Sequence, residues 1–169
     1  RGRAAGYTLK LPFEDKKMQS KKEFIDDIAV SLGGYLAEKM VFDDLTTGAS
    51  NDLQVLTALA RNMVTKYGMS EKMGPVALEE GDGRAMFGEG ITGKKHSEKV
   101  SAEIDAEVTH IIDKAHRSAE HILNTHRKTL DAIAQKLVEV ENIERDEFEK
   151  ILLVNGITPK KKEDIEHSE

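Results

Sequence analysis

Apolar residues recur at intervals of three and four along most of this chain, and this spacing restricts its fold more than any other feature. The clearest segment opens with Ser20 and Glu23, the residue pair of a capping box at a helix N-terminus. The sequence therefore predicts a helix from residue 20 to residue 42. Gly33 and Gly34 lie in its middle, which predicts a close-packed neighbour or a bend there. The apolar stripe consists of Phe24, Ile25, Ile28, Leu32, Leu36 and Met40.

Further helices are predicted in the rest of the chain. One follows the stretch "TTGASNDL", residues 46–53, and Gly68 is placed to act as its C′ residue. Amphipathic helices joined by loops pack as a bundle, so the predicted fold class is mainly α, a helical bundle. The second helix carries Leu53, Leu56, Ala60, Met63 and Tyr67 on one stripe. The C-terminal stripes consist of Val100, Ile104, Val108, Ile111, Ala115 and Ile122, then Leu130, Ile133 and Leu137, then Phe148, Ile151 and Leu152.

Two other segments depart from the helical pattern. Residues 5–11 alternate apolar and polar side chains, which predicts one short N-terminal β-strand ended by Pro12. Residues 69–97 hold six of the 13 glycines and predict a long mobile loop. We therefore expect one helical domain over residues 1–154 and a charged, disordered tail over residues 155–169.

Composition excludes several classes of function. The net charge of −6 gives no basic surface for nucleic acid. The absence of Cys removes disulfides, thiolate metal ligands and cysteine nucleophiles. No segment approaches the roughly 18 consecutive apolar residues of a membrane span, so we expect this segment to be soluble and to make no membrane contact.

Histidine spacing does not predict a metal site built from histidines alone. His110 and His121 share one flank of the long predicted helix, but eleven residues separate them, roughly 16 Å along a helix axis. The chain contains no His-Glu-x-x-His motif, the two-ligand helix of zinc peptidases. We therefore expect the histidines to be solvated or structural.

Asp52 is the remaining candidate for chemistry. An acid in the first helical turn complements the helix dipole and contributes about 0.3–1 kcal/mol. Ser50 or Asn51 is the expected N-cap, which would leave Asp52 free to point at something else. From these residues alone, a helix start and a ligand position both remain open.

Four motifs in order carry a family resemblance: "RGRAAGYTL", "LGGYLAEKMVF", "TTGASNDL" and "ARNMVTKYGMSEKMGPVAL". Together they resemble the peptidase domain of FtsH-type membrane-anchored AAA proteases. The match is dense from Arg1 to Leu78 and looser to about Leu153.

This resemblance implies the function of a larger protein. Such proteases are zinc metalloendopeptidases joined to a separate ATP-driven ring, usually hexameric, that degrades unfolded and membrane proteins. The expected partners are polypeptide substrates and further copies of the parent. The expected location is the cytoplasmic face of a bacterial inner membrane, or an organellar membrane.

The resemblance also assigns residues. In the family, zinc is held by two His of a His-Glu-x-x-His helix and by an Asp at the head of a later helix, which corresponds to Asp52. Glu38 matches an acidic position of the family and is a minor rival for zinc, while Lys39 stands where a second Glu is common. Gly6, Tyr7 and Thr8 match a strand beside the cleft, which either binds extended substrate by edge addition or only packs its own domain.

This chain departs from the family pattern in one decisive respect. The His-Glu-x-x-His helix, with the glutamate that acts as general base, is expected before Arg1. The segment then has no catalytic residue of its own and is expected to be inactive in isolation. The alternative function is a stand-alone helical assembly or adaptor module derived from such a protease.

Overall fold

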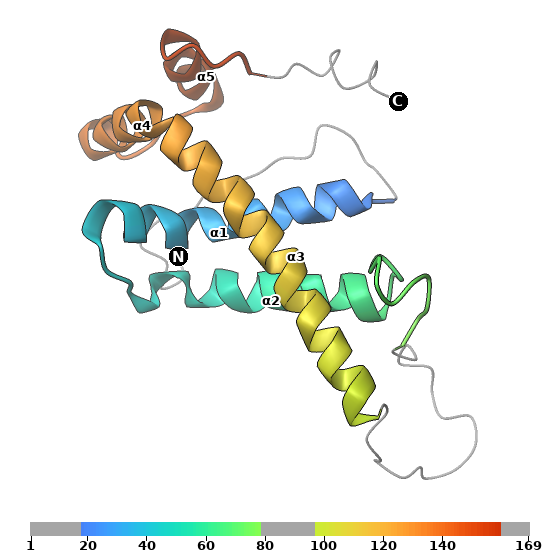
Figure 1. Cartoon of the computed structure of the whole chain (residues 1–169). Coiled ribbons are helices and arrows are strands. Elements are labelled where there is room, and N and C mark those ends of the chain that lie inside the picture. Colours follow the sequence, from blue (N-terminus) through green and yellow to red (C-terminus); the bar gives the residue numbers. More distant parts are fainter. Residues whose placement is uncertain (1–17, 79–96, 160–169) are drawn as a thin grey trace, which may run out of the picture. The chain divides into compact units, whose positions relative to one another are not determined.

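The computed structural model describes residues 18–78 and 97–159, and these residues are mainly helical, as predicted (Figure 1). No strand is present in these two ranges, and the predicted N-terminal strand, with Gly6, Tyr7 and Thr8, lies outside them. The elements are α1 (Lys21–Phe42), the 3₁₀ turn η1 (Thr47–Ala49), α2 (Ser50–Thr65), α3 (Glu98–Thr125), α4 (Arg127–Val140) and α5 (Arg145–Val154).

The chain divides into two compact units. The first runs from Ser20 to Leu130 and holds α1, η1, α2 and α3, while the second includes the residues from Asp131 onward. In the first unit α1 and α2 lie side by side and α3 crosses both of them (Figure 1). The three helices therefore form a small bundle on their own.

The local signal at the start of α1 is confirmed. The Ser20 hydroxyl oxygen accepts a hydrogen bond from the Glu23 N–H at 3.2 Å, and the Glu23 carboxylate accepts one from the Ser20 N–H at 2.7 Å. These two bonds satisfy backbone donors that the first helical turn leaves without partners. The helix ends at Asp43, whose φ of 51° is left-handed and stops the α-helical path.

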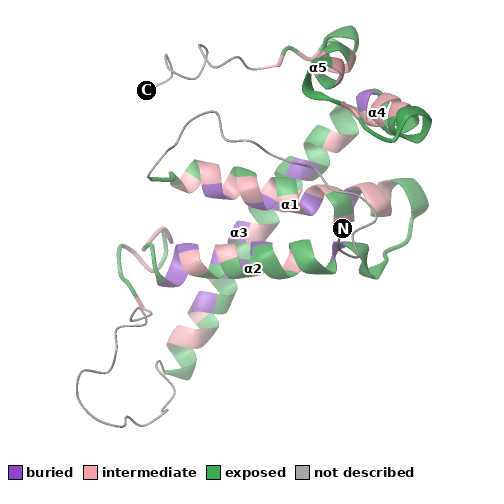
Figure 2. Ribbon diagram, turned by 180° about the vertical axis from the view of Figure 1, so that it is seen from behind, coloured by how far each residue is buried: buried purple, intermediate pink, exposed green. Residues whose placement is uncertain are grey.

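The core of the first unit is built from one apolar face of each helix (Figure 2). Most of the stripe residues predicted on α1, α2 and α3 are buried, but Tyr67 is 51% exposed and Ile122 is 52% exposed. The Tyr67 ring stacks on Phe24 with ring centroids 5.4 Å apart, so it covers the core from outside. The central buried side chains are Ile28, Leu32, Leu36, Leu56, Ala60, Met63, Ile104, Val108, Ile111 and Ala115.

Gly68 ends α2 differently from the prediction. The helix closes at Thr65, with Lys66 as its C-cap, so Gly68 lies one residue beyond the expected C′ position. Its φ of +60° is left-handed, and a Cβ there would approach backbone atoms of Pro75 at 3.2–3.3 Å. Glycine is therefore required at Gly68 by both backbone conformation and space.

The second unit contains helices that bury little of their apolar surface. Within residues 131–159 no residue is fully buried. The helices α4 and α5 are joined by an ion pair between Lys136 and Glu147 at 3.1 Å. Both predicted C-terminal helices are confirmed, and the last ten residues of the predicted tail lie outside the described ranges.

The predicted close-packed neighbour of Gly33 and Gly34 is wrong for the part of the chain that the structure describes. A Cβ built on either glycine meets no atom within 4 Å, and α1 continues through both. We expect Gly34→Ala to raise the free energy of unfolding by about 0.5–1 kcal/mol, because alanine loses less backbone entropy in a helix. Urea unfolding followed by circular dichroism measures this, and a destabilised variant would reveal a neighbour that needs the space.

Packing of α2 against the core can be tested at Leu56, which is 2% exposed. Leu56→Ala should lower the free energy of unfolding by about 2–5 kcal/mol, since it leaves a cavity between the helices. Val55→Ala is the matched control, because Val55 is 53% exposed and should cost about 0.5 kcal/mol or less. Equal losses in urea unfolding would contradict the packing described here.

Candidate functional site

The stretch Thr46 to Leu53 folds as a 3₁₀ turn that runs directly into α2. The Thr46 hydroxyl oxygen accepts a hydrogen bond from the Gly48 N–H at 3.1 Å and so caps η1. The N-cap of α2 is Ala49, which has no side chain able to cap it. The predicted caps Ser50 and Asn51 are wrong, because the preceding turn shifts the helix start and places both inside the first turn.

Asp52 lies in this first turn and its side chain is exposed. No side chain among residues 18–78 and 97–159 forms an ion pair or hydrogen bond with it. A carboxylate in this position complements the helix dipole and also remains open to a partner from solvent. The geometry therefore leaves Asp52 available as a ligand.

The carboxylate of Glu38, the alternative zinc ligand, is hydrogen-bonded to another residue of this chain. Its Oε1 accepts a hydrogen bond from the Thr46 hydroxyl at 2.6 Å, and its Oε2 accepts one from the Thr46 N–H at 3.1 Å. Both carboxylate oxygens thus hold the loop between α1 and α2. This engagement favours Asp52 over Glu38 as a metal ligand.

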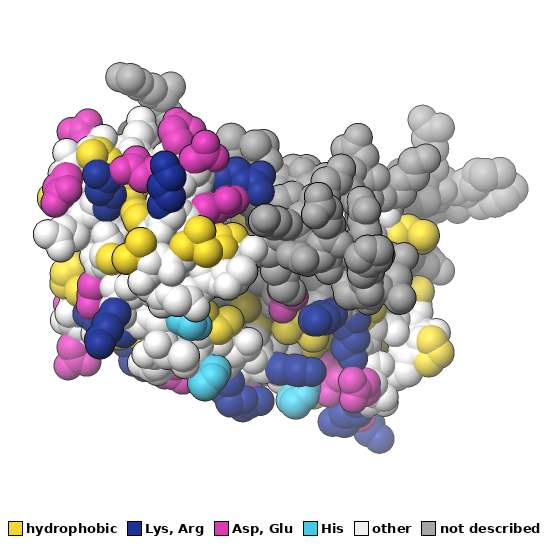
Figure 3. Space-filling model, turned by 90° about the horizontal axis from the view of Figure 1, so that it is seen from above, with side chains coloured by type: hydrophobic (Ala, Val, Ile, Leu, Met, Phe, Trp, Pro, Cys, Tyr) yellow, Lys and Arg dark blue, Asp and Glu magenta, His cyan; other side chains and the backbone are white. Residues whose placement is uncertain are grey.

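Histidines do not gather into a site in the described part of the chain. His110, His116 and His121 lie on α3, and His126 is its C-cap. On the face shown in Figure 3, histidine side chains lie at the surface and apart from one another. Residues 18–78 and 97–159 contain no group of three or more His, Asp or Glu that could hold a metal ion.

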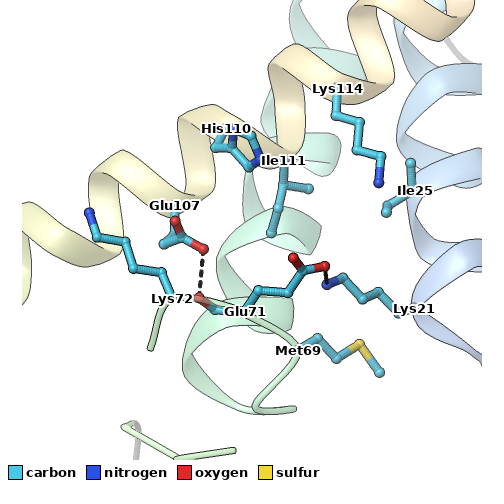
Figure 4. A pocket seen from close by; sticks show the side chains of 10 residues that line it. Lys21, Ile25, Met69, Glu71, Lys72, Glu107, His110, Ile111 and Lys114 are labelled. Atoms are coloured by element: carbon cyan, nitrogen blue, oxygen red, sulfur yellow. Dashed lines mark hydrogen bonds and ion pairs between the residues drawn. The ribbon is translucent and has the colours of Figure 1, made fainter. Parts of the chain in front are cut away.

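A hollow of about 350 Å³ lies elsewhere in the first unit, between α1, α3 and the segment after α2 (Figure 4). Ile25, Met69 and Ile111 line it with apolar surface. Polar and ionisable side chains complete the lining: Lys21, Ser70, Glu71, Lys72, Glu107, His110 and Lys114.

Two polar contacts order this hollow. The Lys21 ammonium donates to the Glu71 carboxylate at 2.9 Å, and the buried Ser70 hydroxyl donates to Glu107 at 2.6 Å. The hydrogen bond and charge of Lys21, followed by the charges of Lys114 and His110, hold the pKa of Glu71 below its ordinary value. The Glu71 side chain is 88% exposed, so this cluster is a solvated tie between α1 and the segment after α2.

Comparison with known proteins identifies the class. The profile described as Peptidase family M41 matches residues 1–151. This chain belongs to peptidase family M41, which confirms the resemblance seen in its motifs.

The relatives carry a consistent name. The chain is 43% identical to ATP-dependent zinc metalloprotease FtsH 1 of Thermoanaerobacter sp. (strain X514), over 98% of this chain and 26% of the relative. It is 44% identical to ATP-dependent zinc metalloprotease FtsH of Thermotoga maritima, over 89% of this chain and 25% of the relative. It is 45% identical to ATP-dependent zinc metalloprotease FtsH 4 of Synechocystis sp. (strain ATCC 27184 / PCC 6803 / Kazusa), over 90% of this chain and 25% of the relative. The chain thus spans about a quarter of the length of these relatives.

Among its described helices, none has the length and apolar character that crossing a membrane requires.

The Lys21–Glu71 tie predicts a pH dependence. Because folding lowers the pKa of Glu71, the pair stabilises the fold above the ordinary glutamate pKa of about 4.3, and this contribution disappears as pH falls through the lower folded value. Glu71→Gln should therefore cause a small decrease in Tm at pH 7 that becomes smaller at pH 3. Thermal unfolding followed by circular dichroism checks this, with Glu120→Gln on the exposed side of α3 as control. A Tm difference that is the same at both pH values would contradict it.

Proposed function

We propose that this chain is part of an ATP-dependent zinc metalloendopeptidase and that Asp52 contributes the third protein ligand to its zinc. The observation that carries the proposal is the position of Asp52: an exposed carboxylate, without a partner among the described residues, at the head of a helix in an M41 family chain. The names of the relatives, ATP-dependent zinc metalloproteases, support the same function.

The metal-binding side chains of the described residues suit a zinc site that is shared with another segment better than a site formed by these residues alone. A carboxylate is a suitable zinc ligand, but the described residues hold no group of three donors. Two imidazoles from a His-Glu-x-x-His segment, which these 169 residues do not contain, would complete a three-ligand site with one open position. When bound, zinc would polarise the scissile carbonyl and activate water for peptide hydrolysis.

The residues of this chain would orient that ligand. Helix α2 is anchored in the core through Leu56, Ala60 and Met63, so the backbone that carries Asp52 is fixed against α1 and α3. Ligands on rigid, packed elements are held closer to productive geometry than ligands on loops. The general base would be the glutamate of the His-Glu-x-x-His segment, so the present segment alone would be inactive.

The other proposed functions concern the longer protein of which this chain would be a part. We propose that a separate domain binds ATP, that unfolded and membrane proteins are the substrates, and that the parent is a membrane-anchored hexamer. Gly6, Tyr7 and Thr8 would pair with extended substrate. Residues 1–154 would be the C-terminal part of the peptidase domain, with a loop at residues 69–97 and a tail at residues 155–169.

An adaptor or assembly module is the second candidate function. It is favoured by the apolar side chains that α4 and α5 leave exposed, among them Val138 at 84% and Val154 at 86%. Exposed apolar residues grouped on two helices suit packing against another protein. Reading the codons upstream of Arg1 separates the two functions, because a continuous frame with His-Glu-x-x-His excludes the adaptor.

Asp52→Ala in the protein extended to include that segment tests the ligand assignment. Zinc affinity and peptidase activity should both fall by more than about 100-fold, since even outer partners of metal ligands cost 10–100-fold. Zinc content by atomic absorption and cleavage of casein measure these losses. Asp26→Ala, an exposed acid on α1, is the matched control and should leave both unchanged. Full zinc and full activity in Asp52→Ala would show that Asp52 is no ligand.

A further inference from the structure

The head of α2 depends on the turn before it. Because Ala49 offers no capping side chain, the first turn of α2 is not fixed by a cap of its own. The backbone N–H of Ser50 instead bonds to the Thr47 carbonyl inside η1. The geometry of η1 therefore determines the orientation of the first turn of α2.

The residue before η1, Thr46, is hydrogen-bonded to the side chain of Glu38 on α1. Thr46 donates two hydrogen bonds to Glu38, from its hydroxyl at 2.6 Å and its N–H at 3.1 Å, and accepts one from the Gly48 N–H at 3.1 Å. We call this group of Glu38, Thr46 and Gly48 the Glu38 clamp. It joins the last turns of α1 directly to η1.

The clamp lies at the surface, and the missing side chain of Gly48 leaves space for it. A Cβ on Gly48 would lie 3.2 Å from the Thr46 hydroxyl oxygen and 3.5 Å from Glu38 Oε1. The following residue, Ala49, is buried at 7% exposure. Hydrogen bonds to a carboxylate are among the stronger ones in proteins, so these two bonds favour one geometry of the turn.

We infer that Thr46 is a positioning residue, which sets the direction of the Asp52 carboxylate toward the metal through the Glu38 clamp. This inference rests on the proposed role of Asp52. Asp52 follows Ala49 by three residues, within the same first turn that η1 orients. A change of turn geometry at Thr46 thus moves the carboxylate while the core contacts of α2 remain in place.

Thr46→Val in the extended protein tests this, since valine has nearly the shape of threonine but no hydroxyl. Zinc affinity, measured by competition with a chromophoric chelator, should weaken about tenfold. Thr46→Ser keeps the hydroxyl and should restore affinity to within about twofold of the parent. Thr57→Val is the matched control, because the Thr57 hydroxyl bonds only within α2, to the Leu53 carbonyl at 2.7 Å, and affinity should not change.

Cobalt(II) substituted for zinc gives a readout that stability alone would not alter. The visible absorption of Thr46→Val should change in shape, whereas that of Thr57→Val should match the parent. All variants are compared at a temperature where circular dichroism shows them folded. Glu38→Gln acts on the same bonds from α1 and should produce no further loss of affinity when combined with Thr46→Val.

The outcomes separate this inference from the ligand assignment. Zinc affinity that falls in Asp52→Ala but is unchanged in Thr46→Val would overturn the positioning role and leave Asp52 a ligand. Zinc affinity unchanged in Asp52→Ala would overturn both, because the clamp then has no ligand to position. Additive losses from Glu38→Gln and Thr46→Val would also contradict a clamp that acts as one unit.

Discussion

The packing of α2 against α1 and α3 is the interaction on which the rest of this structure depends. Helix α2 has only 16 residues, and most of the stability of such a helix in a protein comes from the packing of its apolar face. Its buried apolar residues, Leu56, Ala60, Met63 and Val64, belong to the core that it shares with the other two helices. Because apolar burial fixes the body of α2, the head of the helix can carry polar groups that add little to stability.

Local signals in the sequence predicted much of this arrangement. The capping box at Ser20 and Glu23 needs only four consecutive residues and was correct in both hydrogen bonds. The apolar stripes predicted α1, α2 and α3, since helical periodicity follows directly from burial of one face. The same pattern overestimated the burial of Ile122 and Tyr67, which are about half exposed. Burial at a given position also depends on where the neighbouring helices lie, and helical spacing does not predict that.

The start of α2 was harder to predict because two signals compete there. Ser50 and Asn51 are good capping residues, but η1 already continues the chain into helical geometry, so the helix opens at Ala49 without a capping side chain. The choice depends on the bonds from Thr46 to Glu38, eight residues earlier on another helix. The Lys21–Glu71 tie, fifty residues apart, likewise leaves no spacing signal. The proposed role of Asp52 rests on the family motifs, since the charge and position of Asp52 are explained equally well by a plain helix start.

Fixing the head of α2 within this chain has a consequence for metal binding. A single exposed carboxylate holds zinc weakly, so strong binding requires that several donors be placed together in advance. The Glu38 clamp and the α2 core contacts lie entirely between Ser20 and Leu130, so under the proposed zinc role this unit alone would set the direction of the Asp52 carboxylate. The donors of the proposed His-Glu-x-x-His segment would then meet a ligand that is already ordered, and less conformational entropy would be lost on binding. The division of the ligand set between two segments is thus compatible with a tight site, provided that the turn at Thr46 stays closed on Glu38.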